Sequence, residues 1–130
     1  MIELTYQDIM PDRFLEAFGL LLEKDLDMGP AVEVARSIDT ISQELANAKK
    51  VKNELIKKFG AEIKEDDKVV QWDISTATDE NKLAFEEKYK DLLDQKFEID
   101  MSAKVMLAKG DGKMKASHAY LLRKVIDIKV

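Results

Sequence analysis

The chain of 130 residues contains no cysteine, which excludes disulfide bonds, thiol nucleophiles and thiolate metal sites. No apolar run approaches the roughly eighteen residues that span a bilayer. The first residues, MIELTYQDIMPDR, lack the basic start and continuous apolar core of a signal peptide. We therefore expect a cytoplasmic protein without a membrane partner.

Residue types that carry chemistry are also scarce. With one histidine, His118, and no cysteine, a zinc site would have only carboxylates as its other ligands. General-base catalysis by His118 would need an orienting partner and a nucleophile, which the sequence does not identify. We expect His118 at a solvent-facing or cap-adjacent position. The run KGDGK at 109–113 matches neither a calcium loop nor a phosphate-binding loop and predicts a turn. The sequence therefore predicts no enzyme, no metal and no cofactor.

What is abundant is charge, and it is unevenly distributed. The net charge is −5, with 36% charged and 45% hydrophobic residues, a composition typical of one highly charged globular domain over 1–130. Residues 61–101 carry 6 basic and 13 acidic groups, whereas residues 102–130 carry 7 and 2. Such blocks either form an internally paired surface or attract a partner of opposite charge.

Three segments alternate apolar and polar residues and predict short strands: 2–6, 69–75 and 97–107. We expect them to form one small antiparallel sheet, with a buried indole at Trp72. Residues 61–68, AEIKEDDK, predict a charged loop. The C-terminal segment 115–130 fits a short helix, and its last residues fit a strand equally well.

Helical spacing of apolar residues predicts three helices, at 12–24, 31–59 and 79–95, the last with Thr78 as its N-cap. A turn over 25–30 should separate the first two. Gly60 should close the long helix in a left-handed conformation. The fold class that follows is α+β, with a long helical hairpin or a three-helix layer beside the small sheet.

The long helix carries an apolar stripe at alternating steps of three and four residues. Its members include Val34, Ile38, Ile41, Leu45, Val51 and Leu55. This spacing is typical of a helix that packs along its length against another helix. A helix of this length exceeds what a small domain needs to cover its own core, so the stripe predicts contact with a protein partner or a second copy of the chain. The alternative is that residues 12–24 and 79–95 cover the whole stripe within one monomer.

Two other functions remain open on charge grounds. The acidic segment 61–101, with Asp66 and Asp67 at its start, fits an inhibitor that occupies a basic groove on another protein. The basic C-terminus fits nucleic acid, although a pI near 5.0 argues against phosphate binding as the main function.

The stretch SIDTISQELANAKKVKNELIKKFG, residues 37–60, followed later by FEID at 97–100, resembles a family of small tailed-phage and prophage accessory proteins of unknown function. The matching positions are Pro30, Ala35, Ile38, Glu44, Leu55, Ile56, Lys58, Phe59, Gly60, Glu98, Ile99 and Asp100. The resemblance implies a non-enzymatic accessory or assembly protein, in the host cytoplasm or on the virion. It transfers no catalytic residue.

Overall fold

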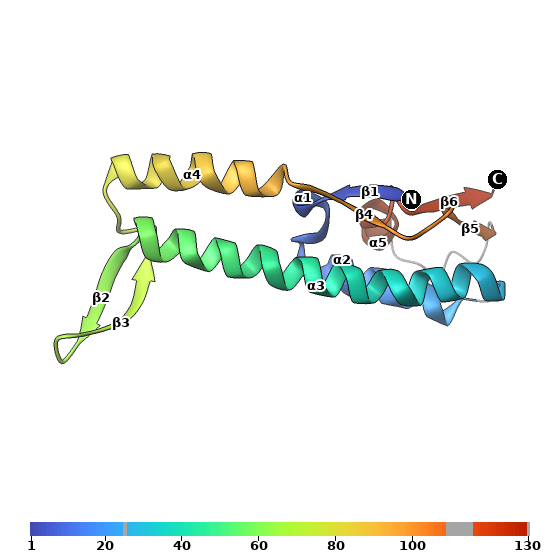
Figure 1. Ribbon diagram of the computed structural model, residues 1–130, viewed down its shortest axis with the longest axis horizontal. Helices are drawn as coiled ribbons and strands as arrows, with labels where there is room; N and C mark the ends of the chain where they lie inside the picture. Colours follow the sequence, from blue (N-terminus) through green and yellow to red (C-terminus); the bar gives the residue numbers. More distant parts are fainter. Residues whose placement is uncertain (25, 109–115, 130) are drawn as a thin grey trace. The chain divides into compact units, whose positions relative to one another are not determined.

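The computed structural model describes residues 1–24, 26–108 and 116–129. Their contacts group into two compact units: unit 1 comprises Met1–Leu45 and Lys96–Val130, and unit 2 comprises Ala46–Gln95. The long helix α3 contributes its first part to unit 1 and its second part to unit 2 (Figure 1). The fold class is α+β, as predicted.

Helix α3 covers Met28–Phe59, 32 residues, and is about 48 Å long at the usual rise per residue. It begins earlier than predicted, so the expected turn over 25–30 is wrong for residues 28–30. The N–H of Ala31 already donates to the carbonyl of Asp27 at 3.0 Å. Pro30 is tolerated because the first turn of a helix does not use its N–H groups.

Helix α3 ends before Gly60, as predicted, but the reason for a glycine at this position differs from the predicted one. The Gly60 N–H donates to the Ile56 carbonyl at 2.7 Å, but Gly60 is not left-handed. A Cβ at this position would lie 2.5 Å from the Ile56 oxygen and 3.1 Å from both the Asp73 nitrogen and the Trp72 Cβ. Glycine is therefore required mainly because the Ile56 carbonyl of α3 leaves no room for a Cβ, and the approach of strand β3 adds to the crowding.

Unit 1 contains the main hydrophobic core. Helices α1 (Tyr6–Ile9), α2 (Asp12–Gly19) and α5 (Ala116–Leu121) and the 3-10 helix η1 (Leu20–Glu23) enclose it together with the first part of α3. The largest buried side chains include Phe14 and Phe18, whose rings stack with centroids 6.1 Å apart. The predicted helix at 12–24 is confirmed as α2 continued by η1.

Two small sheets complete unit 1. Strand β1 (Ile2–Thr5) pairs antiparallel with β4 (Lys96–Ile99), and β5 (Val105–Ala108) pairs parallel with β6 (Ile126–Lys129). The predicted strand over 97–107 is thus wrong as one element, because its two halves pair with different distant segments. The C-terminal segment forms both a helix, α5, and a strand, β6. The predicted turn at 109–113 lies outside the described residues.

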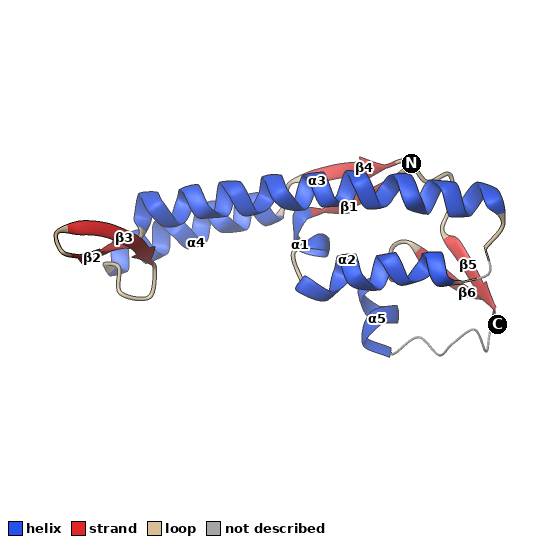
Figure 2. Ribbon diagram, turned by 90° about the horizontal axis from the view of Figure 1, so that it is seen from below, coloured by secondary structure: helices blue, strands red, loops and turns tan. Residues whose placement is uncertain are grey.

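Unit 2 consists of the second part of α3, a β-hairpin and helix α4 (Asp79–Leu93), which runs alongside α3 (Figures 1 and 2). The hairpin pairs β2 (Ala61–Glu65) with β3 (Lys68–Asp73). The prediction of a loop over 61–68 is therefore wrong, and so is the single predicted sheet. Thr78 caps α4 as predicted, since its side chain accepts the Asn81 N–H at 3.2 Å.

Candidate protein-binding surface

The first half of the predicted apolar stripe on α3 is used by the chain itself. Val34 and Ile41 are fully buried in the core of unit 1, and Ile38 and Leu45 are half-buried against that core. These side chains stabilise unit 1 and offer little surface to a partner. The second half differs at Val51, which is 43% exposed, whereas Leu55 is half-buried like Ile38 and Leu45.

Unit 2 has almost no core of its own. Of its 50 residues, all of which the structure describes, only Ala48 and Leu92 are buried, whereas the core of unit 1 holds fifteen buried apolar residues. Several apolar side chains of unit 2 are instead exposed: Val51, Val69, Val70 and Leu83. A folded segment of this size normally hides more of its apolar surface, so these exposed side chains of unit 2 are suited to contact with another chain.

One cation–π contact joins α3 to α4, and a ring stack lies beside it on α4. The rings of Phe85 and Tyr89 stack on α4 with centroids 5.6 Å apart, and the Lys52 ammonium lies 5.3 Å from the Tyr89 centroid. Such cation–π contacts contribute about 0.5–1 kcal/mol at partly exposed sites.

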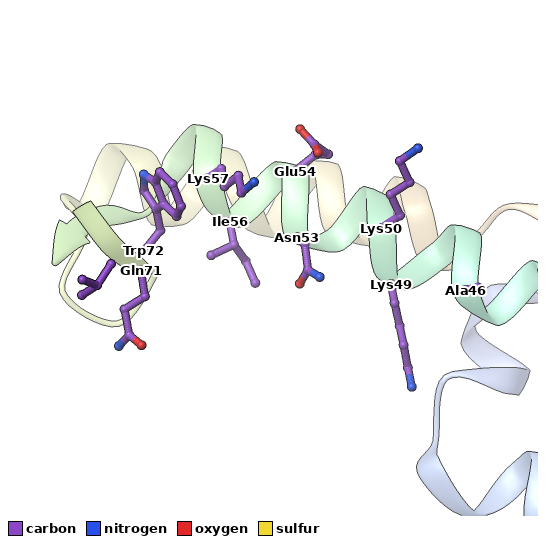
Figure 3. A pocket seen from close by; sticks show the side chains of 10 residues that line it. Ala46, Lys49, Lys50, Asn53, Glu54, Ile56, Lys57, Gln71 and Trp72 are labelled. Carbon is purple, nitrogen blue, oxygen red and sulfur yellow. The ribbon is translucent and has the colours of Figure 1, made fainter. Parts of the chain in front are cut away.

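On another side of α3 lies an open hollow of about 580 Å³, which we call the α3–β3 hollow (Figure 3). Helix α3 supplies Ala46, Lys49, Lys50, Asn53, Glu54, Ile56 and Lys57, and strand β3 supplies Val70, Gln71 and Trp72. Lys49 and Lys50 extend in opposite directions, while Lys57 lies beside Trp72 with its ammonium 5.4 Å from the ring centroid. The hollow therefore combines apolar surface with three positive charges and one carboxylate.

The two helices of unit 2 carry opposite charge. Residues 46–59 of α3 contain five lysines and one glutamate, a net of +4, whereas α4 contains five carboxylates and three lysines, a net of −2. Within residues 46–95, the only ion pair joins Lys64 and Glu62 at 3.7 Å, both on β2. The lysines of α3 and the carboxylates of α4 thus remain unpaired with each other.

Asp66 and Asp67, expected as the start of an acidic binding segment, form the hairpin turn. Their φ angles are 50° and 63°, and both side chains are exposed. Positive φ at both central residues is the requirement of a tight two-residue hairpin turn, and Asp tolerates that conformation better than most residues. The segment 61–101 is divided among the hairpin, α4 and β4, so its carboxylates belong to separate elements.

Asp73 stabilises the turn that follows the hairpin. Its Oδ1 accepts hydrogen bonds from the Ser75 hydroxyl at 2.7 Å and the Ser75 N–H at 2.8 Å. These bonds, the hydroxyl's first, hold the pKa of Asp73 below its ordinary value. The carboxylate orders the chain between β3 and α4.

The structure places the one histidine differently from its prediction. His118 is 9% exposed, so the expected solvent-facing position is wrong, but it lies near the start of the short helix α5, as the alternative cap-adjacent position requires. Among residues 1–24, 26–108 and 116–129, no three His, Asp or Glu side chains are placed to hold a metal ion. No helix in the described part of the chain is long and apolar enough to cross a membrane.

The exposed Leu83 and Val70 were not predicted as binding residues. Leu83 lies off the apolar face of α4 and is exposed. One leucine among many charged residues does not show in the sequence whether it will be exposed. Val70 lies two residues before Trp72 and shares its face in the predicted strand 69–75, but a register shift between Ile63 and Lys64 changes the alternation of the hairpin. The Trp72 indole is half-buried rather than buried.

Comparison with protein-family models, with curated proteins and with solved structures finds no match to this chain.

Proposed function

We propose that this protein is a non-enzymatic binding protein that acts through protein–protein contacts made by unit 2. The observation that carries the proposal is the near absence of buried side chains in residues 46–95. Folding buries too little apolar surface there for a stable core, and contact with another chain would bury Val51, Val70 and Leu83.

The proposal moves the binding surface along α3 from the position predicted by the sequence. The stripe residues Val34 and Ile41 belong to the core of unit 1, whereas Val51 and Leu55 lie in unit 2. Unit 1 would then serve as the stable body, and unit 2 as the part that meets the partner. The sequence resemblance to tailed-phage and prophage proteins supports an accessory or assembly role, in the host cytoplasm or on a virion.

Site-specific photo-cross-linking tests the proposal whatever protein the partner is. A photo-reactive amino acid replaces Val51, Val70 or Leu83 in the full chain, produced in its native host, and Asp39 serves as the exposed control on α3 in unit 1. We expect discrete cross-linked species from the three unit 2 positions and none from Asp39. Equal or absent cross-linking at all four positions would contradict the proposal.

A further inference from the structure

The outward surface of α4 carries one apolar side chain among carboxylates. Leu83 is 59% exposed, and Glu80, Glu86 and Glu87 lie three residues before it and three and four residues after it. On a helix these positions surround Leu83 on the same face. All three glutamates are exposed, so the four residues form an acidic surface with an apolar centre, which we call the Leu83 knob.

The α3–β3 hollow has the complementary character. Ile56, Val70 and Trp72 supply its apolar surface, and Lys49, Lys50 and Lys57 supply positive charge around it. None of these three lysines forms an ion pair with a carboxylate of the chain within residues 46–95. An apolar side chain flanked by glutamates would therefore bury the exposed apolar atoms and form ion pairs with the ammonium groups.

We propose that the α3–β3 hollow binds the Leu83 knob of a second copy of this chain. The inference rests on the proposed function and names its partner. Each copy carries both a knob and a hollow, so the knob of one copy can occupy the hollow of the other, and a pair that is two-fold symmetric makes the contact twice. The observation that favours a second copy over a different protein is the charge on this chain itself, +4 on residues 46–59 and −2 on α4.

Two variants test the contact from its two sides. Leu83→Glu removes the apolar centre of the knob, and Lys49→Glu combined with Lys57→Glu reverses the charge of the hollow. Sedimentation equilibrium of the wild-type chain should give twice the chain mass of 14.8 kDa at high concentration. Each variant should raise the dimer dissociation constant at least ~10-fold, the effect expected when an interface anchor is lost.

Met106→Glu is the matched control, because Met106 is 58% exposed but lies in unit 1. It places a glutamate at an equally exposed apolar position outside the contact, so the dissociation constant should not change. Circular dichroism on all variants checks that helix content is retained.

Mixing the two defective variants separates a lost contact from damaged folding. The Leu83→Glu chain keeps an intact hollow, and the lysine-reversed chain keeps an intact knob, so an equimolar mixture should form a heterodimer with one of the two contacts. Misfolded chains would not recover association on mixing. A mixture that associates no more strongly than either variant alone would overturn the two-sided contact.

Three further results would overturn the inference. They are a wild-type chain that is monomeric up to about 500 µM, a dimer that both variants leave unchanged, and cross-links from Leu83 that join only a different protein. In the last case the proposed function stands, because unit 2 still binds a protein. Absence of any cross-link from unit 2 would remove both the inference and the proposed function.

Discussion

The ammonium group of Lys57 lies 5.4 Å from the centre of the Trp72 ring, and this contact joins the last turn of α3 to strand β3. Trp72 is the only tryptophan of the chain. Its fluorescence therefore reports specifically on unit 2, where the proposed binding surface lies. The backbone beside it depends on Gly60, because the Ile56 carbonyl and the Trp72 Cβ leave no room for a side chain there.

Gly60→Ala should destabilise unit 2 by about 2 kcal/mol, because the added Cβ overlaps the backbone oxygen of Ile56, which has no flexible end to move. Urea unfolding followed by circular dichroism measures this change, because helices of both units contribute to the signal. Gly29→Ala is the control, since nothing lies within 4 Å of a Cβ there. We expect that control to be neutral or stabilising by about 0.5 kcal/mol; equal effects at both glycines would show that the close approach is absent.

Ser37→Ala should raise the free energy of unfolding by about 1 kcal/mol, because the fully buried Ser37 hydroxyl has no hydrogen-bond partner among the residues that the structure describes. Alanine also has the higher helix propensity. Ser42→Ala, at an exposed position of the same helix, isolates that propensity effect, which should be about 0.5 kcal/mol. Thermal unfolding of both variants checks the difference, and a loss of stability in Ser37→Ala would mean that the hydroxyl is satisfied.

The hairpin turn should reject a β-branched residue. Asp66→Val should destabilise unit 2 by about 1–2 kcal/mol, because φ is positive at position 66 and Cβ branching disfavours that conformation. Glu65→Val removes the same charge from the neighbouring strand position without this conformational cost. Trp72 fluorescence during urea unfolding distinguishes the two, and a tolerated valine at 66 would contradict the turn geometry.

Tyr6 should titrate well above an ordinary tyrosine. Its hydroxyl donates to Glu44 Oε2 at 2.6 Å, and this bond, then burial, then the negative charge of Glu44 raise the pKa of Tyr6 to about 12. Absorbance at alkaline pH measures the titration, and the difference between wild type and Tyr6→Phe isolates this one ring. A difference curve centred near the ordinary tyrosine value of about 10 would contradict the hydrogen bond.

The sign of the linked stability follows from the raised pKa. The folded state holds the Tyr6 proton more tightly than the unfolded state, so the contribution is complete below pH 10 and is lost as pH rises from about 10 to about 12. Tyr6→Phe should therefore lower the free energy of unfolding at neutral pH. It should also reduce the loss of that free energy between about pH 10 and about pH 12.

The Asp8 carboxylate gives the opposite dependence of stability on pH. Burial alone would raise the pKa of Asp8, but hydrogen bonds from Lys124, at 2.6 Å, and from Thr5 outweigh it and lower the pKa. The stability that Asp8 contributes is present above its unfolded pKa, near 3.9, and is lost as pH falls through the lowered folded value. Asp8→Asn should lose stability at neutral pH but little below pH 3, as acid unfolding of the two chains would show.

The sequence predicted the helices, whose apolar spacing repeats over many residues that are close neighbours along the chain. Helical spacing and the Thr78 cap were sufficient for α2, α3 and α4, because their hydrogen bonds form between near neighbours. Strand pairing depends on distant partners. The sequence therefore did not show that 97–107 is divided into β4, which pairs with β1, and β5, which pairs with β6. The hairpin was missed because Asp66 and Asp67 lack the glycine that usually marks such a turn.

The candidate surface was predicted only in part, for a related reason. The stripe on α3 has one continuous spacing in sequence, yet Val34 is buried in unit 1 and Val51 is 43% exposed in unit 2. Periodicity shows which side chains share a face of a helix but not how much of that face the rest of the chain covers. The hollow beside Trp72 depends on β3 meeting the end of α3, which no local pattern encodes.

The most direct measurement is amide hydrogen exchange of the full chain at about 5 µM and about 500 µM. We expect amides of residues 46–95 to exchange faster than those of the unit 1 core in the dilute sample, and to slow markedly in the concentrated one while unit 1 stays unchanged. If unit 2 is as protected as unit 1 at both concentrations, it is stable without another chain, and the proposed binding surface is contradicted.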